Sequence, residues 1–177
     1  MVTVFAQAVL AIVFATSCAG KIRDLGRFHR TILAFDVLPA RLSTPAARLL
    51  VATEGLLVVL LVAGLWLPSS MSAATRAGLT LAGVLLVAYT AALVRVKLRQ
   101  IRVSCNCFGT GVTVVSWADV VRNALFLLIA GAGLAGGTAV LSATDRALVV
   151  LVAAPLALLM INFSDVVSVS QKSFTAG

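Results

Sequence analysis

Two cysteines separated by a single residue are the feature of this 177-residue sequence most suited to chemistry. Cys105 and Cys107 stand in the segment Cys-Asn-Cys-Phe-Gly. A disulfide between them would close a very small ring, which adds little loop-closure stabilisation and is expected to be strained. Strained, exposed disulfides are the labile ones. Arg99 and Arg102 upstream and a helix start downstream both favour the thiolate, which is the attacking species. The segment therefore predicts a redox pair.

Two other interpretations of the same thiols remain. They could be inert loop cysteines, or they could bind a soft cation such as Cu(I), with Cys18 or His29 completing the site. No second C-x-C, C-x-x-C or Met-rich run accompanies them, so redox chemistry is favoured over metal binding. Cys18 is interpreted first as a small packing residue and second as a third thiol that exchanges with the pair. His29, between Arg27 and Arg30, is interpreted as an exposed interfacial residue.

Polar side chains inside or beside apolar stretches are the next candidates. Glu54 is the one acid deep in such a stretch, where a carboxylate is costly and often functional. It is either the structural partner of a polar group on a neighbouring helix or a proton carrier coupled to thiol chemistry. Ser116 and Asp119 predict a helix-capping box. Asp119 with Arg122 predicts an i,i+3 pair, and Asn123 could bond across helices.

The elements that must position these residues are predicted to be membrane-spanning helices. Of the residues, 61% are hydrophobic and 11% charged, and mean hydropathy is +1.11. Ordinary soluble domains have about half apolar and a quarter charged residues, so a soluble enzyme, a secreted disulfide scaffold and a disordered chain are disfavoured. Each of five apolar stretches is long enough to cross a bilayer as a helix. These stretches cover about residues 2–19, 49–67, 77–94, 124–141 and 147–163.

The basic residues predict the orientation in an inner (cytoplasmic) membrane. With the N-terminus outside and the C-terminus inside, only Arg76 and Arg146 of the 14 basic residues lie on the outer side. Basic residues placed between apolar runs also argue against a nucleic-acid-binding groove. The inner side then carries Lys21, Arg23, Arg27, Arg30, Arg41, Arg48, Arg95, Lys97, Arg99, Arg102, Arg122 and Lys172.

The connections add local expectations. Residues 21–47 are amphipathic and are predicted to lie along the inner interface, with Pro39 and Pro45 ending that segment before the second span. Gly133 and Gly137 form a small-xxx-small pair that would let another helix approach closely.

In its order of features the sequence resembles the methylamine-utilisation membrane proteins (MauE), a branch of the DoxX-like four-helix membrane proteins. The resemblance covers about residues 1–140, and the family usually has Cys-Gly-Cys-Phe-Gly where this chain has Asn106. The residues that carry it are Lys21-Ile22-Arg23-Asp24 with Phe28, Leu38-Pro39, Glu54, Cys107-Phe108-Gly109, Ser116-Trp117 and Arg122-Asn123.

This resemblance implies an all-α integral membrane protein with a DoxX-like four-helix bundle over residues 1–140. Residues 141–163 would add a fifth span, and residues 164–177 a polar tail. It further implies a role in maturing a disulfide-rich extracytoplasmic client, classically the small subunit of methylamine dehydrogenase, beside a thioredoxin-like partner. Cys105 and Cys107 carry over as the redox pair and Glu54 as the motif acid, whereas Cys18 matches no motif.

Several alternatives stay open at this point. The family's clients fold outside the cytoplasm, but the charge distribution places Cys105 and Cys107 on the inner side. Electrons could cross the bilayer, the segment could be reached from outside, or the orientation could be inverted. No cofactor is expected, and involvement of a quinone is undetermined. A thiol–disulfide oxidoreductase is the leading interpretation, with a non-redox scaffold or chaperone and a soft-metal (Cu) carrier as the alternatives.

Overall fold

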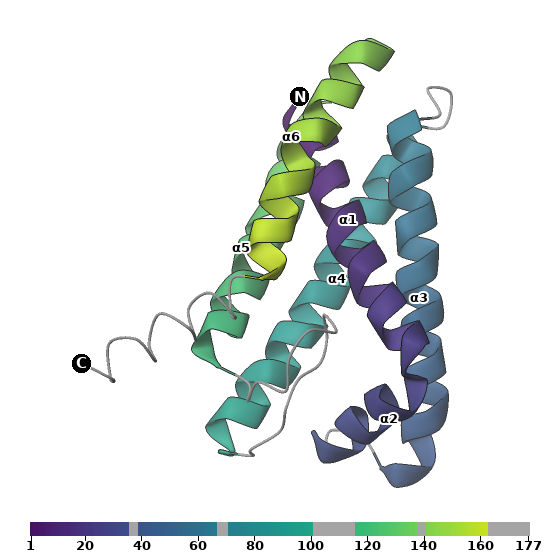
Figure 1. Ribbon diagram of the computed structural model, residues 1–177, viewed down its shortest axis with the longest axis vertical. Coiled ribbons are helices and arrows are strands. Elements are labelled where there is room, and N and C mark those ends of the chain that lie inside the picture. Colours follow the sequence, from purple (N-terminus) through teal and green to yellow (C-terminus); the bar gives the residue numbers. More distant parts are fainter. Residues whose placement is uncertain (36–38, 67–70, 101–115, 138–140, 163–177) are drawn as a thin grey trace, which may run out of the picture.

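Helices make up nearly all of the part of the chain that the structure describes. The computed structural model describes residues 1–35, 39–66, 71–100, 116–137 and 141–162, and contains only helices and short connections there (Figure 1). The predicted all-α fold is confirmed. The helices are α1 (Val2–Arg23), α2 (Leu25–Ala34), α3 (Ala40–Trp66), α4 (Met71–Leu98), α5 (Trp117–Ala135) and α6 (Ala143–Ile161).

Five of these helices, all except α2, are long and apolar enough to cross a membrane. They match the five predicted spans, so the chain is a multi-pass membrane protein. All five extend past the apolar stretches at one end or both: α1 continues to Arg23, α3 begins at Ala40, α4 runs from Met71 to Leu98, α5 begins at Trp117, and α6 begins at Ala143. The fourth span is also offset, because α5 ends at Ala135, six residues before the predicted end. Hydropathy marks only the part of a helix that lies in hydrocarbon, whereas the hydrogen-bonded backbone can continue into the polar interface.

Four helices form a closed ring, and the fifth span packs on its outside. α1 contacts α3, α3 contacts α4, α4 contacts α5, and α5 returns to α1, while α6 packs chiefly on α1 (Figure 1). Within the apolar window of α1, 61% of the residues are buried, against 22–33% in the other four spans. α1 is therefore the central helix of the molecule.

Small residues set the close approach of α5 to α1. A Cβ added at Gly133 would lie 2.7 Å from the Cβ of Ala6, and one added at Gly136 would lie 2.6 Å from Thr3 Oγ1. At Gly137, the second glycine of the predicted pair, an added Cβ would meet nothing within 4 Å. The prediction is confirmed for Gly133, whereas Gly137 meets α1 through its carbonyl, which accepts a hydrogen bond from Thr3 Oγ1 at 3.3 Å. Gly137 lies beyond the end of α5 at Ala135, so the helical spacing of the pair no longer applies there.

A short helix closes one end of the bundle. α2 begins after Asp24, whose side chain accepts a hydrogen bond from the Arg27 amide at 2.8 Å. We call the end of the bundle that α2 closes the α2 end.

The expectation that Pro45 ends the amphipathic segment is wrong, because α3 begins directly after Pro39 and contains Pro45 in its second turn. The missing amide of Pro45 removes a single backbone bond near the helix start, and the exposed Arg41 there keeps that turn close to water.

Candidate functional site

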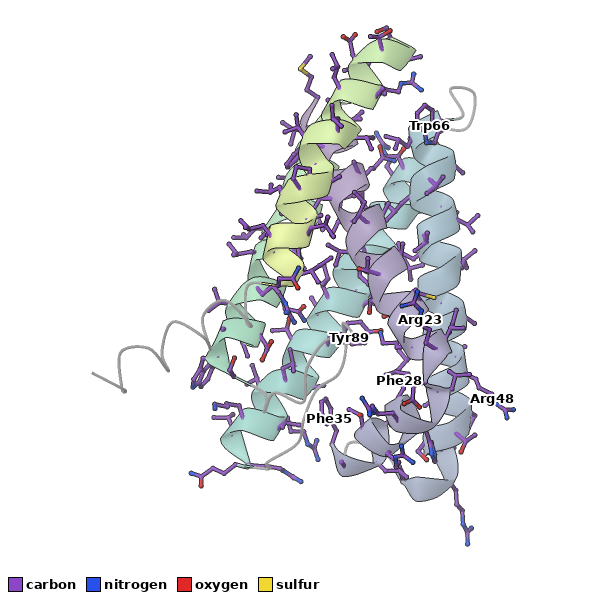
Figure 2. All side chains as sticks on the ribbon, viewed as in Figure 1. Arg23, Phe28, Phe35, Arg48, Trp66 and Tyr89 are labelled. Atoms are coloured by element: carbon purple, nitrogen blue, oxygen red, sulfur yellow. The ribbon has the colours of Figure 1, made fainter. Side chains whose placement is uncertain are left out.

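Three polar side chains from three helices meet inside the bundle, toward the α2 end. Lys21 of α1 is ion-paired through Nζ with Oε1 of Glu54 on α3, and the two side chains are 3% and 0% exposed. The hydroxyl of Tyr89 on α4 donates to the same Oε1 at 2.5 Å. We call these residues the polar cluster. Figure 2 shows Tyr89 pointing from α4 toward the interior, above α2.

Lys21 is enclosed by acceptors and aromatic rings. Its Nζ donates to Ser17 Oγ at 3.0 Å and to Tyr89 Oη at 3.4 Å, in addition to Glu54. An ammonium has three protons, so all three have acceptors. The ring centroids of Phe28 and Tyr89 lie 5.2 and 4.9 Å from Nζ, within the range of cation–π attraction. These contacts hold the ammonium in one place.

The cluster lies well within the hydrocarbon region. Glu54 and Trp66 are twelve residues apart in α3, which is about 18 Å along a helix axis. Trp66 is 51% exposed at the end of α3 far from α2 (Figure 2), a position typical of the membrane interface. The other carboxylate oxygen of Glu54, Oε2, is buried and has no hydrogen-bond partner among the described residues. This oxygen is the place where the cluster could accept a proton.

The cluster corrects the sequence-based interpretation of Lys21 and adds a residue that it missed. Lys21 was predicted to begin the interfacial connection, but it lies in α1 and is 4% exposed. The side chain of Lys21 extends along α1 past Ser17 and pairs with Glu54, the only acid in the second span. Tyr89 was not predicted, although it is the only tyrosine of the chain and stands within an apolar span. For Glu54, the structure shows the polar neighbours, and its role as a proton carrier stays a prediction.

The start of α5 carries a second polar group. Ser116 donates its backbone amide to Asp119 Oδ2 at 2.8 Å, which confirms the capping box. Arg122 Nη2 lies 3.3 Å from Asp119 Oδ1, and Nη1 donates to the carbonyl of Ile161 at the end of α6 at 3.1 Å. Asn123 donates to Thr90 Oγ1 of α4 at 3.4 Å, the predicted bond across helices. Arg122 thus links α5 to α6.

An apolar pocket of about 290 Å³ separates these two polar groups. α1, α2, α4 and α5 supply most of its lining, α3 adds Leu50, and several of the lining side chains are aromatic. Phe28 and Phe35, both labelled in Figure 2, are two of these aromatic lining residues. The polar lining residues are Ser17, Lys21, Thr31, Tyr89, Asp119, Arg122 and Asn123. The pocket can therefore hold a hydrophobic molecule that also forms a few hydrogen bonds.

Of the three cysteines, Cys18 lies in the described part of the chain, and Cys105 and Cys107 lie outside it. Cys18 is buried, and its Sγ lies 3.8 Å from the carbonyl of Val51, one turn before Glu54 on α3. Cys105 and Cys107 lie in residues 101–115, outside the described residues, so the redox pair stays a prediction. The described neighbours Gln100 and Ser116 follow α4 and precede α5 at the α2 end.

The histidine has a different role from the one predicted. His29 is half-buried, and its Nε2 lies 2.8 Å from Ser43 Oγ and 3.0 Å from Thr44 Oγ1. These contacts hold α2 against the start of α3, so His29 is not a freely exposed interfacial residue. Within the described residues no group of three His, Cys, Asp or Glu side chains could hold a metal ion.

A comparison with protein families matches residues 1–136 to the family described as methylamine utilisation protein MauE. The chain belongs to the MauE family. Proteins named "Methylamine utilization protein MauE" from Paracoccus denitrificans and Paracoccus versutus are 32% and 30% identical to it over 124 and 122 residues. The alignments cover 68% of this chain and 62% of each relative. No solved structure matches the chain.

The MauE match covers α1 to α5 and ends before α6 begins at Ala143. All three residues of the polar cluster, both residues of the C-x-C and the whole lining of the pocket lie within it. The MauE region therefore coincides with the four-helix ring and its short α2 closure. In this chain α6 is joined to that ring through α1 and through Arg122.

Proposed function

We propose that this MauE-family protein is a membrane thiol–disulfide redox protein that acts in methylamine utilisation. In this proposal Cys105 and Cys107 cycle between dithiol and disulfide and support disulfide formation in an extracytoplasmic client. The names of the two Paracoccus relatives support the metabolic setting. The family resemblance suggests the small subunit of methylamine dehydrogenase as the client and a thioredoxin-like protein as the partner.

The observation that carries the proposal is the buried polar cluster at the end of the bundle where α4 stops and α5 starts. When two thiols become a disulfide, two electrons and two protons leave them, so a redox pair in a membrane needs groups that take up protons. The carboxylate of Glu54 is such a group: its Oε1 accepts a hydrogen bond from Tyr89 at 2.5 Å, and its Oε2 has no hydrogen-bond partner among the described residues. The two helices that flank the C-x-C segment both reach this end of the bundle. α4, which carries Tyr89, ends there at Leu98, and α5 begins there at Trp117.

The first experiment follows the redox state of the two cysteines in cells. A membrane-impermeant maleimide is added to intact cells with and without prior reduction, and again after the membrane is opened, and the mass shift is read. We expect labelling of Cys105 and Cys107 to depend on reduction. Labelling before the membrane is opened would place the pair on the outer side, and labelling only afterwards would place it on the inner side.

The second experiment tests whether the thiols are needed. Cys105→Ser and Cys107→Ser should abolish maturation of the client while the protein remains in the membrane, and Cys18→Ala tests the third thiol. Asn106→Ser is the matched control, because it changes the same segment and keeps both thiols. Full client maturation by the double Ser variant would contradict the proposal and favour a non-redox scaffold. Stoichiometric copper on the purified protein, lost in the double Ser variant, would favour a metal carrier.

A further inference from the structure

We propose that the pocket between α1, α2, α4 and α5 binds the ring of a lipid-soluble quinone. This inference concerns binding and goes beyond the proposed thiol chemistry. The pocket lies between the polar cluster and the start of α5, and its walls are mostly apolar, so we expect a hydrophobic ligand. Its volume of about 290 Å³ is just below the usual range of about 300–1,000 Å³ for small-molecule sites, which suits one substituted ring.

The walls of the pocket favour a flat ring. Phe14 of α1, Phe28 of α2 and Phe126 of α5 line it, together with Phe35 just after α2. Aromatic side chains pack on a planar π-system by offset or edge-to-face contacts. A saturated acyl chain gains no comparable geometry from them. The shape and composition of the walls therefore favour an aromatic-like ligand over a lipid tail.

Charge complementarity favours a neutral ligand. Two cations line the pocket, and each already has a carboxylate: Lys21 is paired with Glu54, and Arg122 with Asp119. The two pairs together carry no net charge. An anionic headgroup or a fatty-acid carboxylate would have to compete with these acids in a medium where ionic groups are expensive to bury. A neutral molecule with carbonyl acceptors meets no such competition.

Two hydrogen-bond donors in the pocket can serve such acceptors. Ser17 Oγ accepts from Lys21, and its own hydroxyl proton has no acceptor among the described residues. The Asn123 amide gives one N–H to Thr90 and has a second. These donors come from α1 and α5, and a quinone carries two carbonyl oxygens. If the proposed thiol chemistry also holds, the quinone would take two electrons and two protons from Cys105 and Cys107, which would leave a disulfide and a quinol.

Photo-crosslinking of the purified full chain in nanodiscs tests the binding. An azido derivative of decylubiquinone is the probe, and mass spectrometry identifies the labelled peptides. We expect labels on pocket-lining segments of α1, α4 or α5, displaced by unlabelled decylubiquinone and not by oleate or phosphatidylglycerol. Equal displacement by oleate or phospholipid, or labels spread over the lipid-facing surface, would overturn the proposal.

Matched variants sharpen the test. Ala92→Phe places a ring in the pocket and should reduce labelling at least fivefold, whereas Ala91→Phe, on the adjacent exposed position of α4, should leave it unchanged. Ser17→Ala should weaken binding about fivefold, as expected for one lost hydrogen bond. Thr16→Ala is its control, because Thr16 bonds to its own helix at Ile12. Equal labelling in Ala92→Phe and Ala91→Phe would refute the site.

The same assay separates this inference from the thiol proposal. Cys105→Ser/Cys107→Ser should keep full labelling, because neither residue is needed for the ring to bind. If this double variant is labelled normally but fails to mature the client, the quinone pocket is intact and the loss of function comes from the missing thiols. Absent labelling in the wild-type protein, with normal client maturation, would refute the quinone site and leave the thiol proposal standing.

Discussion

Lys21 and Glu54 stabilise each other because neither charged group could be buried alone in hydrocarbon, and Tyr89 adds to the pair. An unpaired ammonium or carboxylate at this depth would be neutralised or would draw in water, so pairing is what allows full burial. The tyrosine adds a hydrogen bond to the carboxylate and a ring beside the ammonium. The cluster therefore both ties α1, α3 and α4 together and holds exchangeable protons.

Glu54→Gln should destabilise the protein strongly. The change keeps the side-chain shape but leaves the Lys21 ammonium without a carboxylate, and breaking a buried ion pair costs about 3–5 kcal/mol. We expect a lower thermal unfolding temperature in detergent, measured against Arg48→Met, which removes an exposed cation from α3 (Figure 2). Equal unfolding temperatures for the two variants would show that the pair does not stabilise the fold.

Replacing both partners separates stability from proton chemistry. The double variant Lys21→Met/Glu54→Leu should recover most of the stability lost in Glu54→Gln, because well-packed apolar residues can substitute for a buried ion pair. If Glu54 carries protons, the double variant should still fail to mature the client. Normal client maturation by a stable double variant would assign Glu54 a purely structural role.

Tyr89→Phe should have a smaller effect on stability. The ring beside Lys21 remains, and only the hydroxyl bonded to Glu54 is lost, which costs about 1.5–3 kcal/mol for a hydrogen bond to a charged group. Tyr89→Leu should cost more, because it also removes the cation–π contact. Thermal unfolding of the two variants provides the comparison, and an equal loss would mean that the ring contributes nothing.

Parts of this site could be predicted from the sequence and parts could not. Glu54 was evident because a single acid in an apolar run is rare, and Cys105 and Cys107 because of their spacing. Lys21 was assigned to the connection, because a lysine after an apolar run usually lies at the interface. Its pairing with Glu54 depends on how α1 and α3 are rotated about their axes, and apolar composition on all sides of a span gives no such information.

At the scale of elements, the spans were predictable and the details of their ends were not. Twenty apolar residues in lipid leave the backbone no alternative to a helix. The start of α3 was predicted wrongly, because Pro45 was interpreted as a break before the second span. A helix tolerates proline near its start, and α3 contains Pro45 in its second turn. The close contact of α5 with α1 was predicted in part, since Gly133 packs against Ala6 as expected, whereas Gly137 lies past the end of α5 and meets α1 only through its carbonyl.

Gly133→Ala should loosen the packing of α5 on α1. The added methyl would meet Ala6 at 2.7 Å, so the two helices must separate, and overpacking of this kind costs about 1–3 kcal/mol. Gly131→Ala is the control, because the same methyl there meets nothing within 4 Å. We expect a lower unfolding temperature for the first variant only. A similar decrease for both would point to an effect on the helix itself rather than on the contact.

At the scale of the whole molecule, arginines at both ends join α6 to the ring. Arg122 binds the last carbonyl of α6, and Arg146 at the start of α6 donates to the carbonyls of Leu141 and Leu65 at 3.1 Å each. Leu65 is next to the end of α3. Helix ends carry carbonyls without partners in the helix, and a guanidinium inside the protein can satisfy them. Arg146 is therefore a structural bond donor as well as a basic residue near the predicted outer side.

If all five candidate helices cross the membrane, the two ends of the described chain lie on opposite sides of it. We expect a reporter fused before Met1 to be active outside and one fused after Asn162 to be active inside, as the distribution of basic residues predicts. Paired fusions of alkaline phosphatase and a cytoplasmic fluorescent protein measure this. Activity of both fusions on the same side would contradict five crossings, and a full reversal would place the C-x-C segment outside.

The central position of α1 has a consequence for biogenesis. The ribosome delivers α1 first, yet its neighbours α3, α5 and α6 are made later, so the most enclosed helix must wait in the bilayer without them. During that interval Lys21 has no Glu54 to bind, so we expect its ammonium to stay at the lipid headgroups until synthesis of α3 supplies the carboxylate. The order of synthesis would then set the depth of α1, with Lys21 buried only after α3 has been inserted.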